Sequence, residues 1–444
     1  MTNITVIGTG YVGLVSGSCL ADFGNTVICV DNNPEKIETL KQGVIPIYEP
    51  GLNTVVDRNT KAGRLKFTTD LAGSVKQSHV AFIAVGTPPA DDGSADLRFV
   101  EQAAREIGAA MDSYLVVVNK STVPIGTGHK VSLWIKEELV KRGLDIPFDI
   151  VSNPEFLREG SAVQDFTHPD RVVIGSNSDN ARKIMKDIYR SLYLNDTPYI
   201  ETNLESAEMI KYASNAFLAL KITFINEVAN LCEKVGANVQ DVARAVGRDG
   251  RIGSKFLHPG PGYGGSCFPK DTQALARIGR EAGAPLSVVE TTIAANERQK
   301  LKMIDKIEAG FGGPGSLTGK IIAVLGMAFK QNTDDMRDSP AIAICEGLVR
   351  RGAGLRVWDP AAMKEAAWRL EAIKDRVFFS GGEYDAMEGA DALVILTPWN
   401  QFRNLDLVKI KKLLAHSLFF DLRNIYKREE VEDAGLLYFS VGRQ

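Results

Sequence analysis

The 444-residue chain has little net charge and no long apolar run. Its formal net charge is -3, so it offers no basic surface of the kind that binds nucleic acid or an anionic membrane. The longest apolar runs, such as residues 80–85 and 115–118, are strand-length and far too short to span a bilayer. A strand is expected from Ile4, which leaves no room for a signal peptide. We therefore expect a soluble, cytoplasmic protein that binds neither nucleic acid nor a membrane.

Cysteine and histidine are also scarce and scattered. The cysteines Cys19, Cys29, Cys232, Cys267 and Cys345 are odd in number, which is not the pattern of a disulfide framework. Neither the cysteines nor the five histidines form a motif that assigns a metal ligand or a catalytic base. We expect reduced cysteines and no metal site.

The first motif is a glycine-rich loop that follows an apolar strand at residues 4–7. Its sequence is Gly8-Thr9-Gly10-Tyr11-Val12-Gly13, and a second strand at 27–31 ends in Asp31. In such a loop the first glycine allows a tight turn, the second lets a pyrophosphate approach the backbone, and the third lets helix and strand pack. A carboxylate at the position of Asp31 binds both ribose hydroxyls and repels a 2′-phosphate. We therefore predict a Rossmann-type unit that binds NAD rather than NADP.

Further apolar strands are expected at residues 80–85, 114–119 and 172–175, with helical segments between them. This alternation predicts a doubly wound parallel sheet, whose ligands bind at the carboxyl ends of the strands. Thr87 and Thr122 follow two of these strands. We expect cofactor contacts from both, although either threonine could be a simple turn residue.

The middle of the chain predicts one long helix, because residues 204–235 contain neither Gly nor Pro. Thr202-Asn203-Leu204-Glu205 fits a capping box at its start, and Gly236 fits its end. Apolar residues lie on more than one side of this helix, which favours burial between domains or subunits. A homodimer or higher homo-oligomer is therefore expected.

A Gly-rich linker at residues 311–316 precedes a second strand–helix–strand pattern, which ends in Asp359 and lacks the glycine fingerprint. We expect a second, Rossmann-like α/β domain that holds something other than a dinucleotide. The predicted fold is thus α/β, with an NAD-binding domain at 1–201, a central helical domain at 202–310 and a third domain at 316–444.

The strongest candidate for a reactive group is Cys267, in Gly264-Gly265-Ser266-Cys267-Phe268-Pro269-Lys270-Asp271. Pro269 suits the first position of a helix, which would place Cys267 just ahead of a helix N-terminus with Lys270 close by. Both features stabilise a thiolate over a thiol. A thiol beside a redox cofactor suggests that carbon is oxidised while it is covalently held by sulfur.

Two pairs of polar residues stand four positions apart. Glu155 and Glu159, in Asn153-Pro154-Glu155-Phe156-Leu157-Arg158-Glu159-Gly160, would share a face of a helical turn and could exchange protons or order a water. Lys211 and Asn215, on the long helix, could donate to the oxyanion that forms when sulfur attacks a carbonyl. Taken alone, either pair is more often a solvated one.

These blocks together resemble the UDP-glucose/GDP-mannose dehydrogenase family over nearly the whole chain, and most closely its UDP-glucose-oxidising members. The most specific are the blocks around Glu155 and Cys267. A third combines Gly326-Met327-Ala328-Phe329-Lys330 with Asp334-Asp335-Met336-Arg337. The chain departs from its relatives at Pro398, where Glu is common, and this position touches no catalytic assignment.

The resemblance implies a role for each matching residue. The catalytic group would consist of Cys267 as the nucleophile with Lys211, Asn215, Asp271, Thr122 and Glu155. NAD contacts would come from Gly8, Gly10, Val12, Gly13, Asp31, Lys36, Thr87, Thr122, Glu159, Lys270 and Arg337. Contacts to the sugar nucleotide would come from Glu155, Phe156, Leu157, Arg158, Glu159, Lys211, Asn215, Phe256, Leu257, His258, Pro259, Gly260, Gly264 and Lys330, and from Arg251 toward a neighbouring subunit.

The reaction that the resemblance implies is oxidation of UDP-glucose to UDP-glucuronate by two NAD in turn, through a thiohemiacetal and a thioester on Cys267. One alternative is the same chemistry on GDP-mannose or a UDP-N-acetyl hexosamine. Another is a nucleotide-sugar-binding protein without catalysis. Tyr263 and Phe268 resemble the UDP-glucose-oxidising members more than the GDP-mannose ones, which favours UDP-glucose. The intact set Lys211, Asn215, Cys267 and Asp271 favours an enzyme.

Overall fold

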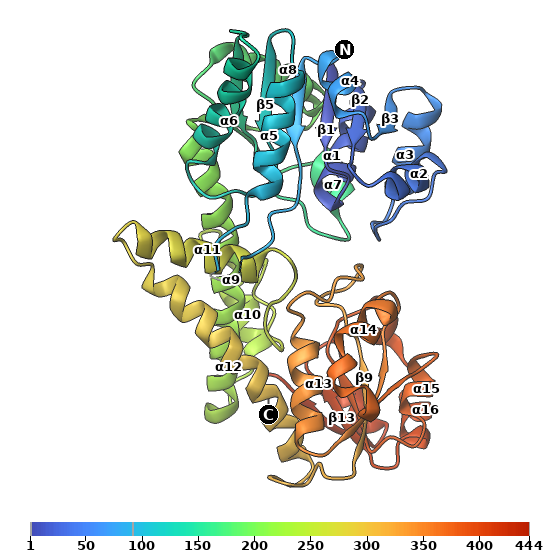
Figure 1. Ribbon diagram of the computed structural model, residues 1–444. Helices are drawn as coiled ribbons and strands as arrows, with labels where there is room; N and C mark the ends of the chain where they lie inside the picture. The colour runs from blue at the N-terminus through green and yellow to red at the C-terminus, as the bar shows by residue number, and fades with distance from the viewer. Residues whose placement is uncertain (1, 91–92, 444) are drawn as a thin grey trace. The chain divides into compact units, whose positions relative to one another are not determined.

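The computed structural model describes residues 2–90 and 93–443, and the chain divides into two compact units between Ser214 and Asn215 (Figure 1). The first unit contains a sheet of eight strands, and the second contains helices and a sheet of six strands. The predicted fold class is confirmed, whereas the three domain boundaries stay a prediction. Within the described residues, no helix is long and apolar enough to cross a membrane.

The first sheet has the strand order β3-β2-β1-β4-β5-β6-β7-β8. Its first six strands thus have the order expected of a dinucleotide-binding fold. Neighbouring strands run parallel except β6 and β7, which meet in an antiparallel pair at Ser152 and Gly175. The strands are β1 (Asn3–Ile7), β2 (Thr26–Val30), β3 (Leu65–Thr68), β4 (Val80–Ile83), β5 (Leu115–Asn119), β6 (Phe148–Ser152), β7 (Val172–Gly175) and β8 (Tyr199–Thr202).

Helices cover both faces of this sheet, which is why its central strands are continuous apolar runs. Along β5, Val116 and Val118 belong to one apolar cluster, and Leu115 and Val117 belong to another. The helices are α1 (Tyr11–Asp22), α2 (Pro34–Lys41), α3 (Leu52–Lys61), α4 (Leu71–Lys76), α5 (Arg98–Ala110), α6 (Thr127–Lys141), α7 (Ala162–Thr167) and α8 (Asp179–Ile188), with a 3-10 helix η1 (Arg190–Asn195).

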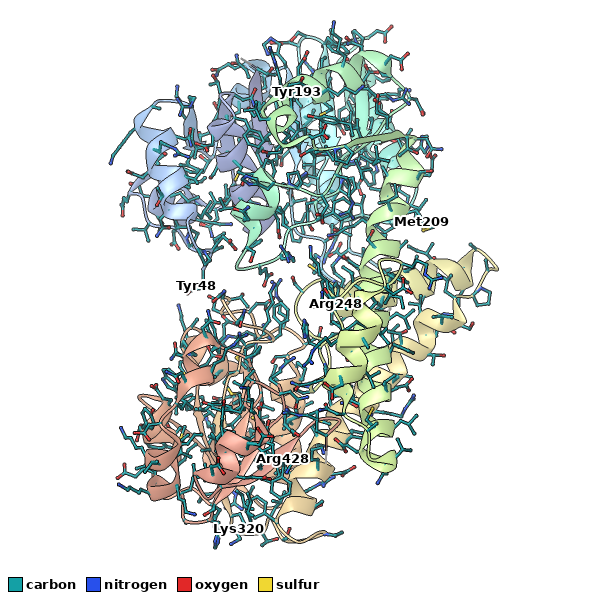
Figure 2. All side chains as sticks on the ribbon, turned by 180° about the vertical axis from the view of Figure 1, so that it is seen from behind. Tyr48, Tyr193, Met209, Arg248, Lys320 and Arg428 are labelled. Atoms are coloured by element: carbon teal, nitrogen blue, oxygen red, sulfur yellow. The ribbon has the colours of Figure 1, made fainter. Side chains whose placement is uncertain are left out.

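The long helix α9 (Leu204–Val235) has the predicted bounds and carries the boundary between the two units. Its cap differs from the prediction, because the Asn203 side chain, rather than that of Thr202, accepts from the Ser206 amide at 2.8 Å. Thr202 cannot serve because it still belongs to β8. Gly236 ends the helix with a φ of +76°. Figure 2 shows Met209, an exposed apolar residue of α9.

Farther along α9, Phe217, Phe224 and Leu231 stand seven residues apart and are 61%, 52% and 60% exposed. Ile225 and Ala229 of the same helix are buried in the apolar core of the second unit, so α9 is apolar on more than one side, as predicted. The second unit continues with α10 (Val239–Arg248), α11 (Phe268–Glu281) and α12 (Ser287–Gly310). Helices α11 and α12 pack against each other, and the predicted linker follows α12 as a run of turns.

The second sheet has the order β11-β10-β9-β12-β13-β14, which repeats that of the first six strands of the first sheet, and all its neighbouring strands are parallel. Its strands are β9 (Ile321–Leu325), β10 (Gly354–Trp358), β11 (Val377–Phe379), β12 (Ala392–Ile395), β13 (Leu418–Asp421) and β14 (Leu437–Ser440). The helices around it are α13 (Pro340–Arg350), α14 (Met363–Arg369), α15 (Glu383–Met387), α16 (Leu407–Leu413) and α17 (Arg428–Asp433), with 3-10 helices η2 (Glu371–Arg376) and η3 (Asn400–Asn404).

Candidate functional site

The glycine loop of the first unit has the geometry that a dinucleotide pyrophosphate needs. Gly8 adopts a φ of +100°, and a Cβ there would lie 2.6 Å from the Ala84 carbonyl oxygen. A Cβ on Gly13 would overlap the Gly8 carbonyl oxygen, so this position requires a glycine for packing. A Cβ on Gly10 would meet nothing within 4 Å. The backbone at Gly10 is thus open to a ligand at the start of α1, where the helix dipole favours a phosphate.

Asp31 follows β2 and accepts hydrogen bonds from this loop. Its Oδ2 accepts from the Thr9 amide at 2.9 Å, the Thr9 hydroxyl at 2.7 Å and the Lys36 ammonium at 3.1 Å. Burial alone would raise the pKa of Asp31, but these donors and the Asn33 amide hold it below its usual range. The side chain is 12% exposed. An ionised carboxylate with access to solvent is what binding a ribose diol requires.

The threonines at the ends of β4 and β5 lie next to each other. The Thr87 hydroxyl donates to the Thr122 carbonyl oxygen at 2.9 Å, and Ser121 Oγ donates to the Val85 carbonyl oxygen at 2.7 Å. Thr87 is buried and Thr122 is half-buried. The two predicted cofactor contacts therefore share one edge of the sheet, where such folds bind ligands.

Glu155 and Lys211 form a buried ion pair in the first unit. Lys211 Nζ donates to Glu155 Oε1 at 2.8 Å, and the Leu157 amide donates to Glu155 Oε2 at 2.5 Å. Burial would raise the pKa of Glu155, but the Lys211 ammonium and the amide hold it below its usual range. The carboxylate is therefore ionised and available as a proton acceptor.

The predicted helical turn that would align Glu155 with Glu159 does not form. Residues 153–158 are irregular, and the Leu157 amide bonds to Glu155 instead of to a helical carbonyl. Within the same loop, the Phe156 ring lies 3.6 Å from the Arg171 guanidinium and 5.5 Å from Lys211 Nζ. Arg158 pairs with Asp165.

A carboxylate that the sequence did not single out holds this loop to the glycine loop. Glu49 is buried, and its oxygens accept from the Gly160 amide at 2.7 Å and the Ala162 amide at 2.8 Å. The Tyr11 hydroxyl, at the start of α1, also donates to Glu49. Because these partners are far apart in the sequence, no local pattern could have identified Glu49. Tyr48, its neighbour, is labelled in Figure 2.

In the second unit, Cys267 stands at the N-terminus of α11, as predicted. It is the capping residue, and its carbonyl oxygen accepts from the Asp271 amide at 2.9 Å. The helix begins one residue earlier than predicted, at Phe268, so Pro269 occupies the second helical position. Cys267 is half-buried, and its sulfur lies 3.5 Å from the Ser266 hydroxyl.

The remaining cysteines are buried. Burial raises the pKa of the Cys19, Cys29 and Cys345 thiols to about 12. These thiols stay protonated and packed in apolar cores, so they are unsuitable as nucleophiles.

Asp271 lies one turn into α11 and accepts hydrogen bonds from two of the predicted site residues. The carboxylate is buried and accepts from Asn215 Nδ2 at 2.6 Å and from Lys270 Nζ at 2.7 Å. The sequence placed Lys270 near the thiol as its cation, and in the structure its ammonium bonds to Asp271. Among the described residues, no group of three or more His, Cys, Asp or Glu side chains could hold a metal ion.

Close backbone contacts hold in place the loops of the second unit that were predicted to contact the sugar nucleotide. Phe256 adopts a φ of +67°, which is strained for a residue with a side chain. The Gly260 amide donates to Asn226 at 2.8 Å, and its carbonyl oxygen accepts from Gln299 at 2.9 Å. A Cβ on Gly264 would overlap the Asp338 carbonyl oxygen. Leu257 and Pro259 are buried, and His258 is exposed.

The charged candidates of the second unit differ in their surroundings. Lys330 Nζ lies 5.4 Å from the Phe329 ring, and Arg337 pairs with Asp335 at 2.9 Å. The Gly265 amide donates to the Arg337 carbonyl oxygen at 2.7 Å, which joins the cysteine loop to this segment. The Arg251 side chain is 89% exposed and pairs with Asp249.

Arg423 was not assigned a role from the sequence. Its half-buried guanidinium donates to the Leu396 carbonyl oxygen at 2.6 Å and lies beside Gly260, where a Cβ would come within 3.0 Å of it. Burial lowers the pKa of Arg423 to about 10, which still leaves it charged at neutral pH. This cation therefore lies against the segment expected to hold the sugar nucleotide.

Three family models match the chain in succession. They describe the NAD binding domain (residues 2–193), the central domain (205–298) and the UDP binding domain (323–428) of the UDP-glucose/GDP-mannose dehydrogenase family. Together they span most of the 444 residues.

Individual proteins similar to this chain belong to the same group. A UDP-glucose 6-dehydrogenase from Rhizobium meliloti is 54% identical over 99% of both chains. The structure of a UDP-glucose dehydrogenase from Pyrobaculum islandicum matches with a TM-score of 0.91 and 39% identity, over 100% of this chain and 98% of that one. A UDP-D-ManNAc dehydrogenase from Pyrococcus horikoshii matches with a TM-score of 0.84 and 30% identity, over 99% of each.

Proposed function

The chain belongs to the UDP-glucose/GDP-mannose dehydrogenase family, and on that premise we propose that this NAD-dependent oxidoreductase converts UDP-glucose to UDP-glucuronate. The conversion takes a primary alcohol to a carboxylate and removes four electrons. Since each NAD accepts one hydride, two NAD are used in turn. The observation that carries the proposal is Cys267, a half-buried thiol at a helix N-terminus. The remaining cysteines, in contrast, are buried.

The residues that would hold NAD fit a dinucleotide. The open backbone at Gly10 would receive the pyrophosphate, and Asp31 would accept from the ribose hydroxyls. Lys36 pairs with Asp31 and would shift toward the adenosine phosphates. The proposed set also contains Gly8, Val12, Gly13, Thr87, Thr122, Glu159, Lys270 and Arg337. When bound, NAD supplies the hydride acceptor.

Cys267 would act after the first oxidation, when the substrate is an aldehyde. Its sulfur adds to the carbonyl carbon, which forms a C–S bond and leaves an oxyanion, a thiohemiacetal. Loss of hydride from that carbon gives a thioester. Water then attacks the thioester, the C–S bond breaks, and the products are a carboxylate and the free thiol. Covalent capture prevents the aldehyde from escaping between the two oxidations.

Two hydrogen-bonded pairs of side chains would stabilise the oxyanion and transfer protons. Lys211 and Asn215 stand one turn apart on α9 and would donate to the oxyanion. Each already bonds to a carboxylate, Lys211 to Glu155 and Asn215 to Asp271. Glu155 and Asp271 would orient water and accept its proton, with help from Thr122.

The proposed contacts to the sugar nucleotide come from three loops and from helix α9. They comprise residues 155–159 with Lys211 and Asn215, then 256–260 with Gly264, and finally Lys330. Arg251 extends from the surface on an exposed side chain, which suits a contact to a neighbouring subunit's substrate.

We also propose that the chain assembles at least as a homodimer through α9. Its exposed residues Phe217, Phe224 and Leu231 form an apolar stripe of the kind that a partner covers. Sedimentation at micromolar concentration should show a dimer or larger, and Phe224→Glu should weaken it. A wild-type protein that sediments only as a monomer would refute this part of the proposal.

The alternative functions are the same oxidation of another nucleotide sugar and the binding of a nucleotide sugar without catalysis. The relative named for UDP-glucose is 54% identical to this chain, and the structure named for UDP-D-ManNAc is 30% identical, which favours the first substrate. A binding protein without catalysis has no need of a thiol at a helix N-terminus beside buried charged pairs. Pro398 follows Thr397 after β12 and has none of the proposed roles.

NADH formation on a panel of nucleotide sugars tests the proposal. UDP-glucose should give the highest kcat/KM, with two NADH formed for each UDP-glucose consumed. A preference for GDP-mannose or a UDP-N-acetyl hexosamine would overturn the substrate, and binding without any NADH would overturn the enzyme.

A further inference from the structure

Lys120, at the carboxyl end of β5, is a buried lysine to which the proposed reaction gives no role. It is only 4% exposed. Its ammonium donates to Asn153 Oδ1 at 3.0 Å and to the Tyr189 hydroxyl at 3.2 Å, and both partners are neutral. The rings of Phe166 and Tyr189 lie 5.6 and 5.7 Å from the nitrogen. Within the described part of the chain, no carboxylate forms an ion pair with it.

The charge of Lys120 needs an explanation, because burying an ammonium without a counter-ion is unfavourable. A neutral side chain such as glutamine could make similar hydrogen bonds, and a methionine could fill the aromatic surroundings. The acid that acts on Lys120 electrostatically is Glu155, which already pairs with Lys211 at 2.8 Å. Two lysines therefore share one buried carboxylate.

Lys120 connects the segments that follow β5 and β6. Asn153, which it holds, stands two residues before Glu155, and Lys120 itself stands two residues before Thr122. Asn153 is fixed from other sides as well, because it accepts from the Tyr189 hydroxyl at 2.7 Å and donates to the Val173 carbonyl oxygen at 2.7 Å. One ammonium thus links the two segments that carry the proposed water-ordering groups.

We propose that Lys120 is a positioning residue of the reaction. Its buried ammonium ties the end of β5 to the segment after β6, and its positive charge keeps Glu155 ionised beside Lys211. This inference rests on the proposed function, which gives Thr122 and Glu155 their roles.

The electrostatic consequence has a definite sign. Burial lowers the pKa of Lys120 to about 7, because burial favours the neutral form of the side chain. Of the groups around it, Glu155 and Lys211 are charged. Burial raises the pKa of the Tyr189 phenol, and raises the pKa of the nearby Cys19 thiol to about 12, so both are neutral. Removing the positive charge of Lys120 should raise the pKa of both Glu155 and Lys211.

The first experiment compares Lys120→Met with Lys120→Arg through the pH profile of kcat/KM for UDP-glucose. Lys120→Met removes the charge, so the acid limb should move to higher pH by about one unit. Lys120→Arg keeps the charge, so its acid limb should stay in the wild-type position even if turnover falls. Loss of turnover in both variants with neither profile displaced would overturn the proposal, because it would reveal only a packing role.

A second experiment needs neither turnover nor a stable Lys120→Met variant. Protein labelled with carbon-13 at the lysine Cε is titrated by NMR, and the Lys120 signal is assigned by its loss in Lys120→Arg. It should titrate near neutral pH in the wild type. In Glu155→Gln it should titrate at lower pH, because the attraction that favours the charged form is gone. Glu205→Gln, at an exposed carboxylate on α9, is the matched control and should leave the signal in place.

A Lys120 signal that is the same in Glu155→Gln and wild type would overturn the coupling. This outcome is distinguishable from failure of the proposed function, which would appear as no NADH with any nucleotide sugar while the Lys120 signal still responded to Glu155→Gln.

Discussion

The six-stranded sheet of this protein has the strand order of the first six strands of the eight-stranded sheet. In each sheet a glycine follows the first strand along the chain and an aspartate follows the second. Gly8 and Gly326 adopt φ values of +100° and +93°. Their amides donate to the neighbouring strand end, to Val30 O at 2.7 Å and to Trp358 O at 2.8 Å. The two loops therefore start from one backbone design.

The two aspartates differ in exposure and in the donors that bind their carboxylates. Asp359 is 1% exposed. Its Oδ2 accepts from the Met327 amide at 2.8 Å, the Ala328 amide at 3.1 Å and the Trp399 indole at 3.0 Å. Its Oδ1 accepts from the amides of Ala361 and Ala362. Asp31, in contrast, is partly exposed and shares one oxygen with Lys36, a side chain that can move away.

This difference indicates which sheet suits a dinucleotide. A carboxylate that already accepts from five donors of the protein has no capacity left for a ribose diol. The loop above Asp359 also lacks the open glycine, since Met327 and Ala328 follow Gly326, and a Cβ on Gly326 would overlap Thr397. The strand order alone thus does not determine the ligand, whereas the hydrogen bonding of one acid does.

Asp359→Ala should have the largest effect on stability. It would leave five donors, most of them buried, without an acceptor, so the free energy of unfolding should fall by about 3–5 kcal/mol. Chemical denaturation followed by Trp fluorescence measures this loss. NAD affinity should stay unchanged in the folded fraction. A loss of NAD affinity without a loss of stability would show that the second acid also serves the cofactor.

Asp31→Ala should have the complementary effect. Loss of the ribose contact should weaken NAD binding by about 1.5–3 kcal/mol, while UDP-glucose binding stays nearly unchanged. Calorimetry with each ligand separates the two. Unchanged NAD affinity would remove the Rossmann assignment of Asp31 and, with it, the distinction between the two sheets.

Trp399→Phe should have the smallest effect, because it removes one of the five bonds to Asp359 and keeps most of the ring. The expected loss of stability is about 1 kcal/mol. Combined with Asp359→Ala, it should cost little more, since the acceptor is already gone. Full additivity in this double-mutant cycle would contradict the proposed saturation of Asp359.

Local patterns were sufficient to predict most of the framework. The run without Gly or Pro predicted α9 with its observed bounds, and the apolar runs predicted the strands to within a few residues. Cys267 at a helix N-terminus was also predictable, because glycines and a proline surround it. In each case, neighbours in the sequence determine the structure.

The errors and omissions depend on distant partners. Glu49 and Lys120 receive their surroundings from residues more than thirty positions away, such as Gly160 and Asn153. The saturation of Asp359 by Trp399 is of the same kind. Such contacts follow from the assembled fold, and no spacing in the sequence encodes them.

The most direct test of the proposed function is the fate of UDP-glucose in the Cys267→Ser variant. Turnover should fall by about three orders of magnitude or more, because the covalent nucleophile is lost. Affinity for NAD and UDP-glucose should be retained, and intact-protein mass spectrometry should detect a trapped sugar-nucleotide ester. Cys345→Ser, at a buried thiol, is the control and should cost stability at most. Oxidation of UDP-glucose to the acid by Cys267→Ser at a near wild-type rate would contradict the covalent mechanism.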